Sequence, residues 1–158
     1  MPLETTIHSG FITDLVAPRE GTCGLSAEEL EQLSYDTALE LLHDFPAFIR
    51  SNPLVTRSAL RKTATGFESF TSPGSGVKIH GTFNLYRSPD VLGVVHFIER
   101  NETKCNLFLG VYIKATLASS HRTLHENFKL AWNEALKHKL GAEEEMEFHV
   151  KQDKEGHD

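Results

Sequence analysis

His96 is the residue whose type and setting best fit acid–base chemistry. It stands in the segment Gly93–Ile98 (GVVHFI), where apolar residues occupy both faces of a predicted strand. An imidazole in an apolar setting can both donate and accept a proton near pH 7, as a general acid or base must. We therefore name His96 the first candidate for catalysis, with Tyr112 or Tyr86 as a hydrogen-bond donor. The alternative is a histidine that only has a hydrogen-bond partner on the outer face of a sheet.

A histidine pair, His121 and His125, is spaced four residues apart at the start of a predicted helix. That spacing places two imidazoles on one helix face, where both could bind one metal ion. No third ligand can be named from the sequence, and a solvated pair also suits this polar helix start. We assign no metal and no cofactor, because the sequence shows no phosphate-binding loop, dinucleotide fingerprint or nucleophile elbow.

Two elements must position these side chains, and the apolar pattern changes its period between them. From Cys105 to Leu117 every odd residue is apolar, which predicts a long strand with one buried face. A turn at Asn101–Lys104 would pair it with the strand before it. Over about Arg122–Leu140 the apolar residues recur at helical spacing, which predicts an amphipathic helix with Phe128 and Trp132 on its buried face.

The rest of the chain predicts a strand, a helical segment and a run of antiparallel strands. Ser26 and Glu29 form a capping box, followed by one helix broken near Ser34 or two short helices that end before Pro46. Strands are predicted over Thr5–Ala17, Leu54–Lys62, Gly66–Thr71, Val77–Arg87 and Val91–Arg100. The sum is an α+β fold in which the last helix covers one face of an antiparallel sheet of five to seven strands.

Composition limits the function classes. The 158 residues carry a net charge of −6, with 39% hydrophobic and 24% charged residues, so we expect one domain over residues 1–141 and a charged, flexible tail over 142–158. The acidic balance argues against a nucleic-acid partner, and no apolar run is long enough to span a membrane. The first residues lack a signal-peptide pattern and the two cysteines lack a disulfide framework, so a cytoplasmic protein is expected.

Two segments resemble a known superfamily. The stretch LSYDTALELLHDFPAFIRSNPLVTRSAL resembles the short helices that lead into the second strand of the helix-grip fold, and LGVYIKATLASSHRTLHENFKLAWNEAL resembles its last strand and gripping helix. From about Thr5 to Leu140 the order of elements is similar to that of the START-like (SRPBCC) superfamily, which includes the birch-pollen-allergen (Bet v 1-like) relatives, the polyketide cyclase/dehydrase group and small fungal members. The cone-shaped nuclear-transport-factor-like fold places its helices first, which the terminal helix disfavours.

The resemblance implies a curved antiparallel sheet wrapped around a long C-terminal helix, two short helices after the first strand, and a ligand cavity. It carries over no catalytic residue. One helix across a curved sheet leaves space between them, so we expect an apolar cavity there. The residues predicted to bind a ligand in it are Phe83, Phe97, Leu109, Val111, Phe128 and Trp132.

Two functions fit such a cavity. The first is a cofactor-free cyclase or isomerase, a pericyclase included, that acts on an apolar polyketide- or terpenoid-type intermediate in secondary metabolism. It would hold a flexible substrate in a reactive shape and move a proton. The second is a non-catalytic carrier or sensor of a lipid or other hydrophobic small molecule. Convergent polar groups in the cavity would favour the enzyme. A homodimer is left open in both.

Overall fold

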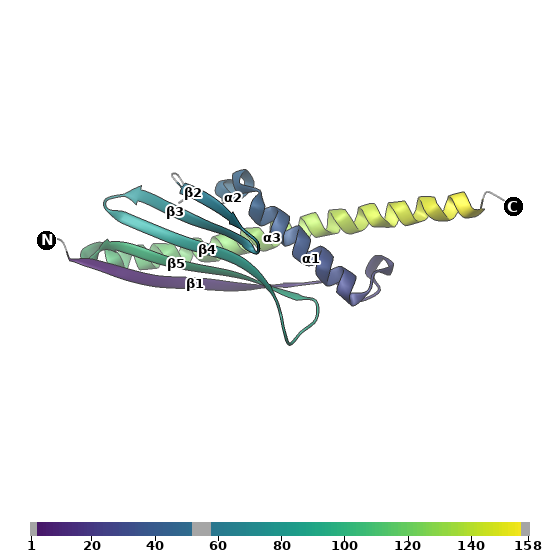
Figure 1. Cartoon of the computed structure of the whole chain (residues 1–158), viewed down its shortest axis with the longest axis horizontal. Helices are drawn as coiled ribbons and strands as arrows, with labels where there is room; N and C mark the ends of the chain where they lie inside the picture. The colour runs from purple at the N-terminus through teal and green to yellow at the C-terminus, as the bar shows by residue number, and fades with distance from the viewer. Residues whose placement is uncertain (1–2, 52–57, 156–158) are drawn as a thin grey trace.

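The chain folds into a five-stranded antiparallel sheet with a long helix packed along one face (Figure 1). A computed structural model describes residues 3–51 and 58–155. The elements in chain order are β1 (Glu4–Val16), a short 3-10 helix (Thr22–Gly24), α1 (Ala27–His43), α2 (Phe45–Ser51), β2 (Ser58–Thr63), β3 (Gly66–Gly74), β4 (Val77–Arg87), β5 (Val94–Asn106) and α3 (Leu107–Glu155). This α+β architecture confirms the predicted fold class and is compatible with a helix-grip fold.

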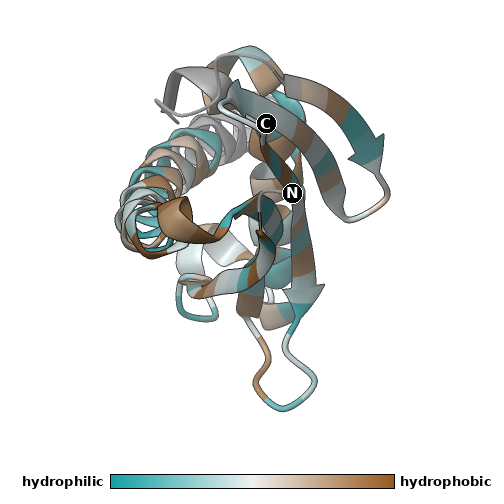
Figure 2. Ribbon diagram, turned by 90° about the vertical axis from the view of Figure 1, so that its left-hand side faces the viewer, coloured by the Kyte–Doolittle hydropathy of each residue, from teal (hydrophilic) through white to brown (hydrophobic). Residues whose placement is uncertain are grey.

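The sheet has the strand order β1-β5-β4-β3-β2, so the first and last strands are neighbours. They pair along their whole length, from Glu4 opposite Asn106 to Val16 opposite Val94. Figure 2 shows the sheet curving around α3, which lies against β1 and β5. The helix also continues well past the end of the sheet (Figure 1). Its backbone is helical to Glu155, and the flexibility of residues 142–158 stays a prediction.

The first helix begins at the predicted capping box. The Ser26 hydroxyl accepts a hydrogen bond from the Glu29 amide at 3.2 Å, and the Glu29 carboxylate accepts one from the Ser26 amide at 2.8 Å. Helix α1 then runs through Ser34 without the predicted break. The following α2 begins at Phe45 and contains Pro46, because a proline in the first helical turn loses no internal hydrogen bond.

The boundary between the last strand and the last helix differs from the prediction. Strand β5 continues through Asn101–Lys104, which is paired with β1 and is no turn. Helix α3 begins at Leu107, so most of the predicted strand Cys105–Leu117 is helical. Asn106 marks the change, because its side-chain oxygen accepts a hydrogen bond from the Phe108 amide at 2.9 Å, as a helix-capping asparagine does. An alternation of apolar residues alone could not reveal this start.

The apolar core fills the space between the sheet, α1 and the middle of α3. One face of α3 carries buried residues at every fourth position, which confirms the predicted stripe: Leu124, Phe128, Trp132, Leu136 and Leu140. Trp132 is 1% exposed, and its indole N–H donates to the Ser34 carbonyl at 3.0 Å. Burial of each large apolar side chain contributes about 1.5–3 kcal/mol, so this stripe holds α3 on the sheet.

Candidate functional site

Next to the apolar core, the space between α3 and the sheet holds polar side chains. Glu99 is 2% exposed, His121 5% and His125 1%. Other buried polar residues lie near them: Ser69, Thr71 and Asn101. Burying a charged or polar group is costly unless it is paired. A cluster of this kind in a protein interior therefore needs a structural or functional reason.

Two elements bring this cluster together. Alternation along β5 turns Glu99 toward α3, on the same face as Phe97. The pairing of β1 with β5 places Glu99 opposite Phe11, so that Ser9 and Thr13 lie on either side of it on β1. On α3, His121 and its neighbour one turn later share a face. One carboxylate from the sheet therefore meets two imidazoles from the helix.

One half of the cluster is a chain of hydrogen bonds. His121 Nδ1 lies 2.8 Å from Glu99 Oε1, which also accepts a hydrogen bond from Asn101 Nδ2 at 2.8 Å. The other ring nitrogen, His121 Nε2, lies 3.1 Å from Ser9 Oγ and 3.5 Å from Asn101 Nδ2. A carboxylate that accepts from Nδ1–H holds the ring in one orientation and leaves Nε2 as the basic nitrogen. The Ser9 hydroxyl then donates to that nitrogen.

The other half of the cluster is built on His125, which has different contacts from those of His121. His125 Nδ1 lies 2.7 Å from Thr13 Oγ1, and its Nε2 lies 3.2 Å from Glu99 Oε2. The second contact has the distance of an ion pair without the geometry of a hydrogen bond, and neither atom has another hydrogen-bond partner within the described residues. The ring stacks on Phe97 at 4.3 Å between centroids and lies tilted against Phe11 at 4.8 Å. His125 is therefore fixed by its aromatic neighbours.

The surroundings of Glu99 keep its carboxyl group ionised. Burial by itself raises the pKa, but the hydrogen bond from His121, the close approach of His125, the electrostatic attraction to His121 and the Asn101 amide outweigh it and lower the pKa from 4.5 to about 2. Hydrogen bonds to the charged form of a carboxyl group always act in this direction. The interior therefore holds a negative charge next to two imidazoles at neutral pH.

A cavity opens beside His121. The cavity has a volume of about 40 Å³ and lies in a recess of about 520 Å³ that includes space open to solvent. One water molecule needs roughly 10–15 Å³ of such space, so the cavity admits a few waters or one small chemical group. Its apolar lining residues are Phe48, Leu60, Phe67, Ile79, Phe83 and Leu117, and its polar ones are Ser69, Thr71, Glu99, Asn101, Ser120 and His121.

The predicted catalytic residues lie apart from this cavity. His96 is on the outer face of the sheet, where its Nδ1 lies 2.7 Å from Asp14 Oδ1. Tyr86 is its neighbour on β4 and is 50% exposed, whereas Tyr112 is 72% exposed on α3. His96 therefore has a hydrogen-bond partner on the outer face of the sheet, as the alternative interpretation expected. The side chains of His96, Tyr86 and Tyr112 do not come together in one site.

The predicted ligand-binding residues divide into four groups. Phe83 lines the cavity. Phe97 and Trp132 belong to the packed core, and Phe128 lines a second small cavity of about 40 Å³ with Phe48 and Leu124 among its other walls. Leu109 and Val111 lie on the exposed side of α3, with 37% and 83% exposure, because this segment is helical and its odd residues do not share a face.

Sequence analysis missed Glu99 and Ser9. A signal for Glu99 was present: it shares the inward face of its strand with Phe97, where a charged residue is unusual. Glu99 lies inside the predicted strand Val91–Arg100, but the predicted turn at 101–104 obscured the signal, because a charged residue close to a turn is not unusual. Ser9 had no signal of its own.

The cluster does not form a metal centre. Within residues 3–51 and 58–155, no group of three or more His, Cys, Asp and Glu side chains is arranged to hold a metal ion. His121 and His125 approach opposite oxygens of Glu99 through different ring nitrogens. The histidine pair noted in the sequence is therefore organised around a carboxylate.

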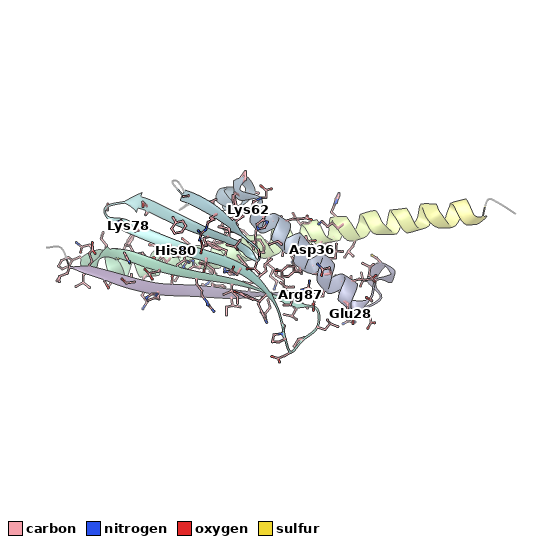
Figure 3. All side chains as sticks on the ribbon, viewed as in Figure 1. Glu28, Asp36, Lys62, Lys78, His80 and Arg87 are labelled. Atoms are coloured by element: carbon pink, nitrogen blue, oxygen red, sulfur yellow. The ribbon has the colours of Figure 1, made fainter. Side chains whose placement is uncertain are left out.

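Two wider hollows lie on the surface and are more open to solvent. One, of about 510 Å³, lies by Asp36 and Lys62, and another, of about 240 Å³, by Lys78 and His80 (Figure 3). Neither contains a buried acid–base pair, so the cavity at His121 is the candidate site.

None of the helices in the described part of the chain is both long and apolar enough to cross a membrane.

No protein-family model matches the sequence, and no curated protein matches it. The chemistry of the site is therefore argued from its geometry.

Proposed function

We propose that the protein is a cofactor-free enzyme that moves a proton on an apolar small molecule, a cyclase or isomerase in type, with pericyclic steps included. The observation that carries this proposal is the His121 imidazole, fixed by a buried Glu99 carboxylate at 2.8 Å in the wall of an apolar cavity. A carrier needs shape and apolar surface but no buried acid–base pair. The arrangement of sheet and helix supports membership of the START-like superfamily.

The proposed mechanism uses His121 as the proton acceptor and donor. Glu99 accepts the Nδ1 hydrogen, so Nε2 carries the lone pair that can remove a proton from a carbon next to a substrate carbonyl. The negative charge of Glu99 attracts the positive imidazolium that forms. Nε2 then returns the proton to another atom of the same molecule, which completes an isomerisation or ring closure. The hydroxyl groups of Ser69 and Ser120, in the same wall, are placed to polarise the carbonyl.

The cavity limits the substrate. A cavity of about 40 Å³ admits one small group, and the remainder of the molecule would lie in the recess against Phe48 and Leu60. A polyketide- or terpenoid-type intermediate of secondary metabolism fits if one end carries the reacting carbonyl. The same proposal places the reaction in the cytoplasm, with no nucleic acid involved. A homodimer remains compatible with it.

The test uses a small aromatic probe whose reaction needs only a base in an apolar pocket. 5-Nitrobenzisoxazole loses its ring C–H proton to the base, and its N–O bond opens to a coloured nitrophenolate. We expect the protein to accelerate this ring opening, and His121→Gln to reduce the acceleration about 100-fold or more, the usual scale for a lost general base. His96→Gln is the matched control, because the same substitution then falls on the outer face.

Thermal unfolding of each variant shows that it is folded. A folded His121→Gln protein that keeps full activity would overturn the proposed role of His121. Saturable binding of the probe without any ring opening would favour the carrier.

A further inference from the structure

Ser9, His121 and Glu99 are bonded in series. Ser9 Oγ lies 3.1 Å from His121 Nε2, and His121 Nδ1 lies 2.8 Å from Glu99 Oε1. These are the distances at which a hydroxyl can pass its proton to an imidazole that a carboxylate holds in place. The two members that activate are buried, whereas Ser9 is half-buried on β1, an edge strand of the sheet. A reagent can therefore reach the hydroxyl from outside.

We propose that Ser9 is a nucleophile and that the protein hydrolyses short-chain carboxylic esters through an acyl-Ser9 intermediate. This activity goes beyond the proton transfer proposed above and shares only the pair of His121 and Glu99 with it. Ser9 is not itself in the cavity wall, but its Oγ lies 3.1 Å from Nε2 of His121, which is. An acyl group that reaches the cavity, of about 40 Å³, is restricted to a few carbon atoms. The reaction requires no cofactor, because the nucleophile, the base and the group that orients the base are side chains of this chain.

Asn101 supplies the group that such a reaction needs for its oxyanion. It lies opposite Ser9 in the pairing of β1 with β5, and its side chain lines the cavity. A side-chain amide has two N–H donors. One binds Glu99 Oε1 at 2.8 Å, and Nδ2 is also 3.5 Å from His121 Nε2, beside the point of attack. The second N–H is released from His121 Nε2 when that nitrogen takes the Ser9 proton, and it can then bind the carbonyl oxygen as it becomes negative.

A similar series built on Thr13 and His125 lacks two of these properties. His125 Nε2 is 3.2 Å from Glu99 Oε2 without the geometry of a hydrogen bond, so the carboxylate does not orient the ring. The imidazole is stacked on Phe97 and lies outside the cavity wall. Thr13 is therefore a built-in control, with a hydroxyl on a neighbouring histidine of the same cluster.

The ester hydrolysis needs no reactant besides the ester and water. Ser9 Oγ attacks the ester carbonyl carbon while its proton moves to His121 Nε2. The bond from that carbon to the alcohol oxygen then breaks, and the leaving oxygen takes the proton from His121. A water molecule attacks the acyl-Ser9 ester with His121 again as the base. The carboxylic acid leaves, and Ser9 Oγ recovers its proton.

Diisopropyl fluorophosphate is a direct probe of the nucleophile. A bond forms between Ser9 Oγ and phosphorus, the phosphorus–fluorine bond breaks, fluoride leaves and the proton passes to His121. Intact mass and peptide mapping should show one diisopropylphosphoryl group per chain, on Ser9. We expect His121→Gln to slow labelling about 100-fold or more, and Thr13→Val to leave it unchanged.

Glu99 is a positioning residue in this mechanism. Its variants therefore need a measurement that would not change if Glu99 had only a structural role. Glu99→Gln should slow labelling, and Glu99→Asp should recover part of the rate and the same dependence on pH as the wild type. Absence of label on Ser9 in folded wild-type protein would overturn the proposal. Label on Ser9 that does not depend on His121 would overturn it too, because the serine would then not be activated.

The two proposals fail separately. Ser9→Ala should abolish the labelling and the hydrolysis of p-nitrophenyl acetate, but it leaves His121 Nε2 as a base. The same variant should therefore still open 5-nitrobenzisoxazole. Loss of both reactions in a folded Ser9→Ala protein would assign the proton transfer to Ser9 as well and would overturn the separate role of His121. Ester hydrolysis that survives in Ser9→Ala would remove Ser9 from the mechanism.

Discussion

Glu99 and His121 join the sheet to α3 through a buried hydrogen bond, 2.8 Å long, with further polar contacts beside it from Ser9, Thr13 and Asn101 to the two histidines of α3. Removing one partner of such a pair leaves the other buried without compensation, which costs more than the pair contributes in net terms. The pair therefore acts on stability and on chemistry at once. Variants of it must be measured for both.

Glu99→Gln tests the charge of the carboxyl group with little change of shape. The pKa of Glu99 is lowered from 4.5 to about 2 in the folded protein, so ionisation stabilises the fold above pH 4.5 and this contribution is lost as the pH falls through about 2. We expect the variant to lower the free energy of unfolding by about 2–4 kcal/mol at pH 7. The difference from the wild type should shrink between pH 4.5 and pH 2. Urea unfolding at pH 7 and pH 3 measures it.

Glu102→Gln is the matched control for this experiment. Glu102 lies on the same strand, but its side chain is 43% exposed and its carboxylate is 3.4 Å from Lys104 Nζ. Such pairs contribute about 0–1 kcal/mol. A difference between wild type and Glu99→Gln that stayed constant from pH 7 to pH 3 would show that the charge of Glu99 does not stabilise the fold.

Gly81 keeps space at the polar end of the cavity. A Cβ atom at this position would lie 2.6 Å from Asn101 Oδ1 and 2.7 Å from Ser69 Oγ, both of which line the cavity. Gly81→Ala should therefore displace both side chains, lower the free energy of unfolding by about 1–3 kcal/mol and slow both proposed reactions. Denaturant unfolding and the two assays measure these effects on one preparation.

Gly141→Ala provides the opposite expectation. Nothing lies within 4 Å of a Cβ atom at this helical position, so alanine should stabilise α3 by about 0.5–1 kcal/mol. If Gly81→Ala proved as harmless as this control, Asn101 and Ser69 would have room to move. The predicted link between this glycine and the cavity would then be wrong.

Strong periodicity made most of the fold predictable. The alternation in Val77–Arg87 gave both ends of β4, and the four-residue spacing of Leu124, Phe128 and Trp132 gave the buried face of α3. The capping box at Ser26 gave the start of α1. Each of these patterns repeats one physical requirement, burial on one face or a satisfied helix end. Several residues therefore carry the same information.

The site was less predictable because its residues meet only through tertiary packing. His121 and His125 were recognised as a pair, but their partner Glu99 belongs to a strand whose end was misplaced. His96 drew attention because its neighbours in sequence are apolar. In a strand covered on one face only, those neighbours lie alternately inside and outside, and His96 falls on the outer face. Apolar sequence neighbours therefore did not imply an apolar environment.

Leu117 and Val111 test the revised boundary between β5 and α3. Both belong to the same row of odd apolar residues, but in α3 Leu117 is 5% exposed and Val111 is 83% exposed. Leu117→Ala should cost about 2–3 kcal/mol, and Val111→Ala should stay within about 0.5 kcal/mol of the wild type. Equal, large losses measured by urea unfolding would restore the strand with one buried face and contradict the helix.

His96→Ala is the remaining test of the first catalytic candidate. The His96 side chain is 30% exposed and pairs at 2.7 Å with Asp14, which is 60% exposed, so the pair is close to the surface and should contribute no more than about 1 kcal/mol to stability. The imidazole also lies on the face of the sheet away from the cavity. We therefore expect the melting temperature to change little, and both probe reactions to proceed at the wild-type rate. Stability and turnover should be measured on one preparation, with His121→Gln in parallel. A loss of turnover in stable His96→Ala, together with full activity in His121→Gln, would move the site to the outer face.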